Sequence, residues 1–152
     1  MEYTDNLKVL FNTITHNLKD KELKDLFDFV IDYNGTDWKK HIVISNNYYK
    51  KKIYSNELAE MFIITWNINA ESKVHDHPDE GCILKVLKGK LKEEIYENRE
   101  DKIEYISEQI LKYNDVGFQI SNKYLHKIKN INKDYTVSLH IYSPPNFKIK
   151  YY

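Results

Sequence analysis

Residues 41–145 consist of short runs rich in Ile, Val, Tyr and Phe, separated by turn residues. Such runs are typical of an all-β sandwich or barrel. Lys88-Gly89-Lys90 has the form of a hairpin turn, and Pro144-Pro145 ends the last run because proline donates no backbone hydrogen bond to a ladder. We expect strands near residues 41–45, 48–54, 60–66, 73–77, 82–87, 90–96, 103–111, 117–121, 126–130 and 136–142.

The first forty residues have a different, helical pattern. Apolar residues recur at intervals of three and four at Leu7, Leu10, Phe11 and Ile14, which predicts a helix over residues 5–17 with one buried face. The same spacing predicts a second helix from about residue 23 to the Asn34-Gly35 pair, and Thr36-Asp37-Trp38 can begin a third helical turn. We interpret these helices as a packing layer outside the β-structure.

Size and composition indicate one globular domain. The chain has 152 residues, 41% of them hydrophobic, and a formal net charge of zero, so its overall charge gives no reason to expect a nucleic-acid or acidic membrane partner. A lone cysteine, Cys82, excludes an intrachain disulfide and fits a reducing compartment. The polar start and the lack of an apolar run of about 20 residues predict a cytosolic, cytoplasmic protein, which we expect to be a monomer. We divide the domain into N-terminal helices (1–38), a β-barrel (41–145) and a tail (146–152).

A His-x-His pair at His75 and His77 is the main chemical signal. In an extended strand both side chains point to one face and Asp76 points to the other, so two imidazoles can bind one metal ion. His126, which opens a later predicted strand, can supply the third ligand from a facing strand. Three neutral imidazoles with open positions suit Fe, Zn, Cu, Ni or Mn. Glu80 is either a fourth ligand or a loop carboxylate in water.

The last predicted strand carries a second group of polar residues. Ser138, His140 and Tyr142 share one face of the strand, and apolar residues share the other. This pattern fits a half-exposed strand. It also fits a hydrogen-bond relay in which His140 contacts both neighbours and holds the Tyr142 hydroxyl toward the metal.

Together these motifs resemble the cysteine dioxygenase family, mononuclear non-haem iron enzymes of the cupin fold. The similarity runs from about residue 48 to residue 145. Its segments are His75-Asp76-His77, Gly81-Cys82 through Leu87-Lys88-Gly89-Lys90-Leu91, His126-x-x-x-Asn130, and Val137-Ser138-Leu139-His140-Ile141-Tyr142-Ser143-Pro144-Pro145. The resemblance implies a mainly β, double-stranded β-helix (jelly-roll) barrel with the helices packed outside.

The resemblance also implies a site and a reaction. Its three histidines would bind Fe(II) without a glutamate ligand, and O2 would be the co-substrate that converts L-cysteine, a small-molecule thiol, to cysteine sulfinic acid. Cys82 and Tyr142 stand at the positions that form a thioether in animal-type members, while Cys82 alone could be a small buried hydrophobe. His140 and Ser138 would support Tyr142, and Trp66 would wall the pocket.

The chain departs from the family pattern where the substrate carboxylate is recognised. The family's Tyr-x-Arg-Asn corresponds here to Tyr48-Tyr49-Lys50-Lys51, so Lys50 replaces the arginine. Lysine pairs with a carboxylate as a point charge, without the bidentate fork. Either cysteine is bound more weakly or the substrate is another thiol, such as 3-mercaptopropionate or cysteamine. The tail is short relative to longer members, which implies a more open pocket.

Two rival functions follow from the same residues. One is a cupin isomerase or hydrolase that uses Zn or Mn, with Glu80 as a fourth ligand. The other is a non-catalytic cupin that binds a metal or a small thiol as a sensor or store.

Overall fold

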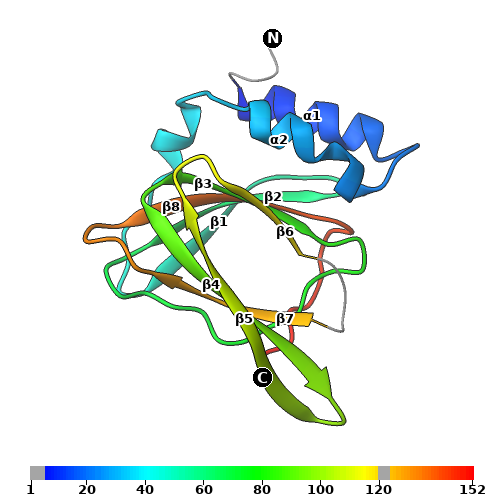
Figure 1. The fold of residues 1–152 in the computed structure, drawn as a ribbon. Coiled ribbons are helices and arrows are strands. Elements are labelled where there is room, and N and C mark those ends of the chain that lie inside the picture. Colours follow the sequence, from blue (N-terminus) through cyan, green and yellow to red (C-terminus); the bar gives the residue numbers. More distant parts are fainter. Residues whose placement is uncertain (1–5, 120–123) are drawn as a thin grey trace.

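The computed structural model, which describes residues 6–119 and 124–152, has two antiparallel sheets with helices against one of them (Figure 1). The five-stranded sheet has the order β1-β2-β8-β3-β6, and the three-stranded sheet has the order β5-β4-β7. The strands of the first sheet are β1 (Tyr48–Ser55), β2 (Glu60–Trp66), β8 (Thr136–Tyr142), β3 (Cys82–Lys88) and β6 (Val116–Gln119). Those of the second are β5 (Lys102–Lys112), β4 (Lys90–Arg99) and β7 (Tyr124–Asn130).

Both faces of the five-stranded sheet are covered, which explains why its central strands are buried along almost their whole length. On β2, Met61 and Ile63 pack against the helices, whereas Phe62 and Ile64 belong to a second cluster between the sheets. Side chains alternate between the faces of a strand, so each face supplies one of the two cores. The inner face is the one that carries the polar residues of the site.

The helical layer consists of α1 (Leu7–Asn17), a 3-10 turn (Leu23–Leu26), α2 (Phe27–Asp32) and a second 3-10 turn (Asp37–His41). Asn6 caps α1 by accepting hydrogen bonds from the first-turn backbone. The predicted second helix is divided, because its first turn is a 3-10 turn closed by reciprocal hydrogen bonds between Glu22 and Asp25. The predicted third turn is present at Asp37–His41. Within the described ranges, no helix combines the length and apolar character needed to cross a bilayer.

Two predicted strands are wrong. Residues 42–45 have strand-like composition but no ladder partner; instead, Val43 N donates to the Thr65 hydroxyl at 3.2 Å. Residues 73–77 are extended, yet they join their neighbours only through isolated bridges at His75. The predicted strand at 117–121 corresponds to β6, and its last two residues lie outside the described part of the chain.

Candidate metal centre and substrate cavity

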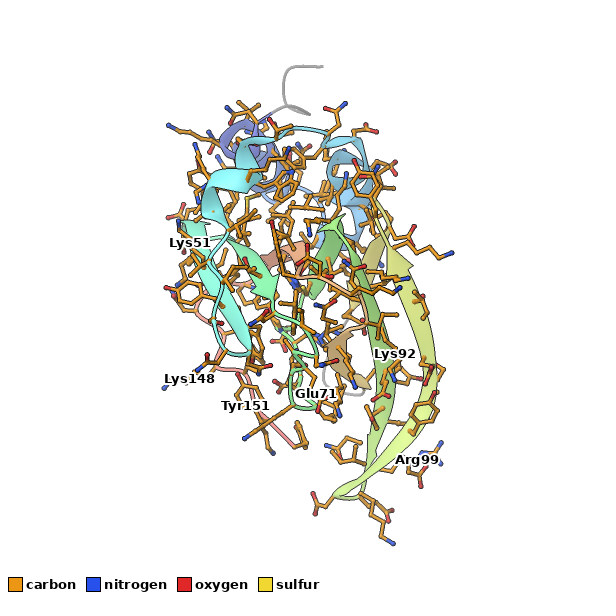
Figure 2. The ribbon with its side chains drawn as sticks, turned by 90° about the vertical axis from the view of Figure 1, so that its left-hand side faces the viewer. Lys51, Glu71, Lys92, Arg99, Lys148 and Tyr151 are labelled. Carbon is orange, nitrogen blue, oxygen red and sulfur yellow. The ribbon has the colours of Figure 1, made fainter. Side chains whose placement is uncertain are left out.

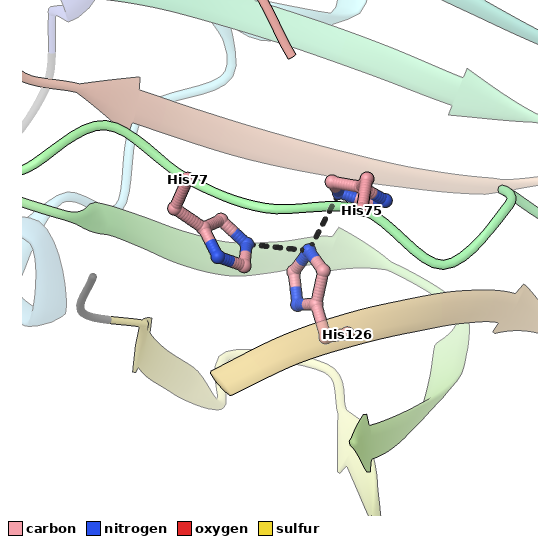
Figure 3. A group of neighbouring side chains, drawn as sticks. All are labelled: His75, His77 and His126. Carbon is pink, nitrogen blue, oxygen red and sulfur yellow. Dashed lines mark hydrogen bonds between the residues drawn. The ribbon is translucent and has the colours of Figure 1, made fainter. Parts of the chain in front are cut away.

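Three buried histidines converge between the two sheets (Figure 3). His75 and His77 lie on the extended segment between β2 and β3, and His126 lies on β7. Two backbone hydrogen bonds of 3.0 Å join His75 to His126. The Nε2 atom of His126 is 2.8 Å from Nε2 of His75 and 2.8 Å from Nε2 of His77. The sequence-predicted ligands therefore meet at one point, with their candidate ligand atoms within 4.8 Å of one another.

The Nδ1 contacts of His75 and His126 indicate that the 2.8 Å distance between their Nε2 atoms requires a cation. His75 Nδ1 is 2.8 Å from the Lys73 carbonyl oxygen, and His126 Nδ1 is 2.8 Å from a Glu93 carboxylate oxygen. Each of these oxygens is an acceptor, so the Nδ1 atom that faces it carries the proton and donates. In a neutral imidazole the other nitrogen, Nε2, then carries a lone pair. Two lone pairs that face each other at 2.8 Å repel unless a proton or a metal ion lies between them. Metal–nitrogen bonds of about 2.1 Å at right angles give a nitrogen separation of about 3 Å, so the donor set fits a metal ion.

Burial keeps the three imidazoles in the form that binds metal. It lowers the pKa of His75, and it lowers the pKa values of His77 and His126 well below the usual histidine value. Neutral imidazoles need not release a proton when a metal binds. His77 Nδ1 is buried and has no hydrogen-bond partner among the described residues.

Glu93 on β4 is a functional residue that the sequence reasoning missed. It is 1% exposed, and besides His126 it accepts hydrogen bonds of 2.7 Å from Gln109 and Gln119. Burial raises the pKa of Glu93, while the two amide hydrogen bonds lower it. A carboxylate on the outer nitrogen of a metal-binding histidine fixes its tautomer and ring orientation. The sequence contained one signal for Glu93: it lies two residues after Leu91 on the same strand, so both side chains point to the buried face.

The row on β8 forms a chain of hydrogen bonds that differs from the predicted relay. Trp66 Nε1 donates to the Ser138 hydroxyl at 2.9 Å, and that hydroxyl is 2.7 Å from His140 Nε2. The other ring nitrogen of His140 faces Cys82 Sγ at 3.9 Å, where the relay placed the Tyr142 hydroxyl. His140 meets Tyr142 edge to face, with ring centroids 6.2 Å apart. The strand is buried on both faces, so the half-exposed alternative is wrong.

Cys82 and Tyr142 are directly opposite partners on β3 and β8. Such cross-strand partners point to the same face, with Cβ atoms about 5 Å apart. Both side chains are buried, and burial raises the pKa of the Cys82 thiol and of the Tyr142 hydroxyl. The thiol is therefore protonated at neutral pH, which fits an unreactive free cysteine.

Lys50 reaches the same region from β1. Its Nζ is 4.4 Å from the ring centroids of both Phe62 and Tyr142, a cation–π arrangement. Burial lowers the pKa of Lys50 to about 8, so the ammonium form predominates at pH 7. Within residues 6–119 and 124–152, Lys50 forms no ion pair, whereas the nearby Lys52 pairs with Glu60 at 2.8 Å.

Two of the three candidate ligands, His75 and His126, border one narrow cavity together with Lys50, and the other predicted substrate-binding residues line it too. Tyr48 and Trp66 are in tilted ring contact at 4.8 Å on one side. Ile149 and Tyr151, from the C-terminal segment, line another side.

Glu80, which was weighed as a fourth ligand, and Arg99, the one arginine of the sequence, do not line this cavity. The exposed Glu80 accepts a hydrogen bond from the Ser143 hydroxyl at 2.8 Å and is not part of the metal-ligand group. Arg99 pairs with Glu97 at the exposed end of β4 (Figure 2).

Comparison with known proteins agrees with this architecture. The sequence model of the family described as "Cysteine dioxygenase type I" matches residues 4–152. The chain is 30% identical to cysteine dioxygenase type 1 of Bos taurus over 118 residues, which cover 74% of this chain and 59% of the bovine protein. Against the Homo sapiens protein the values are 29% over 116 residues, with 72% and 58% covered. The chain thus spans less than two thirds of the length of these relatives.

Solved structures show the fold class. A Klebsiella pneumoniae protein with a double-stranded β-helix domain superposes with a TM-score of 0.60 at 15% identity, covering 74% of this chain and 86% of that chain. A cupin family protein of Methanocaldococcus jannaschii gives 0.51 at 17% identity, covering 66% and 83%. The mainly β cupin fold with outer helices is therefore confirmed. Since the family match extends over almost the whole sequence, the chain belongs to the cysteine dioxygenase type I family.

Proposed function

We propose that this protein is a thiol dioxygenase, acting as a cytosolic monomer, that adds both atoms of O2 to the sulfur of L-cysteine. The reaction is balanced as R–SH plus O2 giving R–SO2H, the sulfinic acid. The observation that carries the proposal is that three imidazoles converge beside a narrow cavity, which is also lined by the ammonium of Lys50, a group that forms no ion pair with the described residues. The imidazoles suit a redox metal, and the ammonium suits the carboxylate of an amino-acid thiol.

Fe(II) is the proposed metal, held by His75, His77 and His126. When bound, it would supply adjacent coordination positions where a thiolate and O2 can meet. The three neutral ligands leave the dication uncompensated, which favours an anionic sulfur over a neutral one. Glu93 holds the His126 ring through its Nδ1 proton, and the Lys73 carbonyl does the same for His75. These two contacts fix ring orientation before any metal binds.

Substrate orientation is the task that we assign to Lys50, Tyr142 and Tyr48. The ammonium of Lys50, held against the rings of Phe62 and Tyr142, would pair with the substrate carboxylate. A lysine without the arginine fork makes one point contact, so tyrosine hydroxyls must supply further donors. Because the charge suits any thiol with a carboxylate, 3-mercaptopropionate is the nearest alternative substrate, and cysteamine tests the need for the carboxylate.

We also propose that Cys82 and Tyr142 become joined by a thioether. Forming the carbon–sulfur bond removes the thiol hydrogen and one ring hydrogen, and the two electrons and two protons pass to O2. Their opposite positions on β3 and β8 support this proposal. Aged, active protein should be lighter by about two hydrogens and should resist thiol reagents after denaturation. Full labelling of Cys82 in such protein would contradict the thioether proposal and favour the alternative that Cys82 is a small buried hydrophobic residue.

The decisive experiment is aerobic incubation of Fe(II)-loaded protein with L-cysteine, cysteamine or 3-mercaptopropionate, with O2 uptake and sulfinate measured together. We expect one O2 consumed per sulfinate formed, and we expect His77→Ala to abolish uptake together with iron binding. Activity with another thiol but not with cysteine would change the substrate alone. Thiol binding with no O2 uptake would instead indicate a non-catalytic metal- or thiol-binding cupin. Stoichiometric zinc in the purified protein would favour an isomerase or hydrolase, although Glu80 is not placed as its ligand.

A further inference from the structure

The C-terminal segment, residues 148–152, lies along the extended chain that carries His75. Lys150 N donates to the Asp76 carboxylate at 2.8 Å, and Asp76 N donates to the Lys150 carbonyl at 3.2 Å. Tyr152 N donates to the carbonyl of the residue before His75 at 2.9 Å. The opposite edge of the same chain is bonded to β7, so the extended chain at His75 lies between β7 and the C-terminal segment. Figure 2 shows Tyr151 in this position at one end of the molecule.

Alternate residues of this segment point to opposite sides, as expected for extended chain. Ile149 and Tyr151 line the cavity, and Ile149 also packs against the core between the sheets. The Tyr151 ring lies 6.2 Å from the His75 ring. The next residue, Tyr152, does not line the cavity; Lys150 Nζ lies over its ring at 4.9 Å. Two adjacent tyrosines thus occupy opposite sides of one short segment.

Tyrosines line the same cavity as Lys50. Tyr48 lines the cavity with Tyr151 and Tyr142. Burial, and then the electrostatic interaction with Tyr151, raise the pKa of Tyr48, so its hydroxyl remains a donor at neutral pH. A carboxylate has about four lone-pair sites, and one ammonium cannot satisfy them all. A second donor must therefore come from a neighbouring wall of the cavity.

We propose that Tyr151 is a specificity-determining residue, whose hydroxyl binds the substrate carboxylate together with Lys50. The substrate's identity as a thiol rests on the function proposed above. The C-terminal segment thereby has two roles: its backbone holds the chain that carries His75, and Tyr151, which is half-exposed where it lines the cavity, recognises the end of the substrate farthest from the sulfur. Thiols that lack a carboxylate gain nothing from this hydroxyl.

The test compares Tyr151→Phe with the matched control Tyr152→Phe. Each change removes one hydroxyl and keeps the ring and the backbone pairing. Dissociation constants of L-cysteine and cysteamine are measured by titration calorimetry on zinc-loaded protein, because zinc undergoes no redox chemistry. Steady-state O2 uptake by iron-loaded protein then separates KM from kcat.

For Tyr151→Phe we expect the Kd and KM for L-cysteine to rise about tenfold, because a hydrogen bond to a charged group is lost. The kcat should stay within about twofold, cysteamine binding should not change, and Tyr152→Phe should behave as wild type. Equal weakening of both thiols, or no weakening of L-cysteine, would overturn the inference. If the wild-type protein consumes no O2, the dioxygenase proposal fails, while the zinc titration still decides the role of Tyr151.

Discussion

Replacing Glu93 by glutamine should weaken metal binding without destabilising the protein. The carboxylate accepts the Nδ1 proton of His126 at 2.8 Å from a position that is 1% exposed. Glutamine keeps the shape and an acceptor oxygen but loses the charge that makes the hydrogen bond strong. The amides of Gln109 and Gln119, which donate to Glu93, can turn over to suit the new side chain. The fold should therefore tolerate the change.

The size of the effect follows from the role of such contacts. Loss of a carboxylate that orients a metal-binding histidine lowers metal affinity about 10- to 100-fold, or roughly 1.4 to 2.7 kcal/mol. The free energy of unfolding of the metal-free protein should rise or stay constant. Burial raises the pKa of Glu93, which means that folding disfavours its charged form above the usual glutamate pKa. A neutral side chain removes that cost.

The assay is competition between the protein and a chelator for Zn(II) or Fe(II), together with urea unfolding of the metal-free protein. Glu94→Gln is the matched control: Glu94 is next on β4 and pairs with Lys92 at 3.3 Å, away from the histidines. We expect weaker metal binding in the Glu93 variant alone. Unchanged affinity in that variant, or an equal loss in the Glu94 variant, would refute the assigned role. A fall in metal-free stability that matched the loss of affinity would do the same.

Three further outcomes follow from buried ionisable groups. Because the pKa of Lys50 is lowered to about 8, its charge is lost as pH rises through that value. The KM for L-cysteine should therefore rise near pH 8, and a pH profile of the Lys50→Arg variant should lack this rise. The pKa values of His77, His126 and His140 lie well below 6.5 in the folded chain, so the unfolded chain binds protons at a higher pH than the folded chain does. The metal-free protein should therefore lose up to about 3 kcal/mol of stability between about pH 6.5 and 5.5, as measured by urea unfolding. Lys85→Met should cost about 2–4 kcal/mol with metal affinity retained, because the buried ammonium donates to carbonyls at the end of α2.

The metal ligands could be predicted from the sequence because their signal is local. Alternation in extended chain places His75 and His77 on one side whether or not the segment belongs to a ladder, so the wrong strand assignment did not affect the pair. Alternation could place Glu93 rather than Glu94 on the face of Leu91, but the contact of Glu93 with His126 depends on the pairing of β4 with β7, which no local pattern contains. Tyr151 was also beyond reach, because backbone hydrogen bonds, which any residue type can make, hold its segment in place.

The relay on β8 shows how a correct face can still lead to a wrong partner. Ser138, His140 and Tyr142 do lie in one row, but each inner-face residue of β8 is also bordered by strands β2 and β3. Diagonal neighbours on adjacent strands lie about 7–8 Å apart, a distance similar to that between alternate residues of one strand, so both kinds of neighbour are within reach of a ring. The direct partner of His140 on β3 is Leu84, and its ring nitrogen faces the diagonal neighbour Cys82.

Lys50 connects the substitution seen in the sequence with the rest of the cavity. The guanidinium of an arginine has a rigid fork of donors, whereas the ammonium of a lysine is a point charge whose orientation depends on the surrounding residues. The ammonium lies 4.4 Å from the ring centroids of Phe62 and Tyr142, and Tyr48 and Tyr151 line the same cavity. In the function that we propose, substrate recognition is thus divided among β1, β8 and the C-terminal segment. Restoring an arginine at position 50 should make substrate binding less dependent on the Tyr151 hydroxyl, so the combined effect of Lys50→Arg and Tyr151→Phe should be non-additive in Kd.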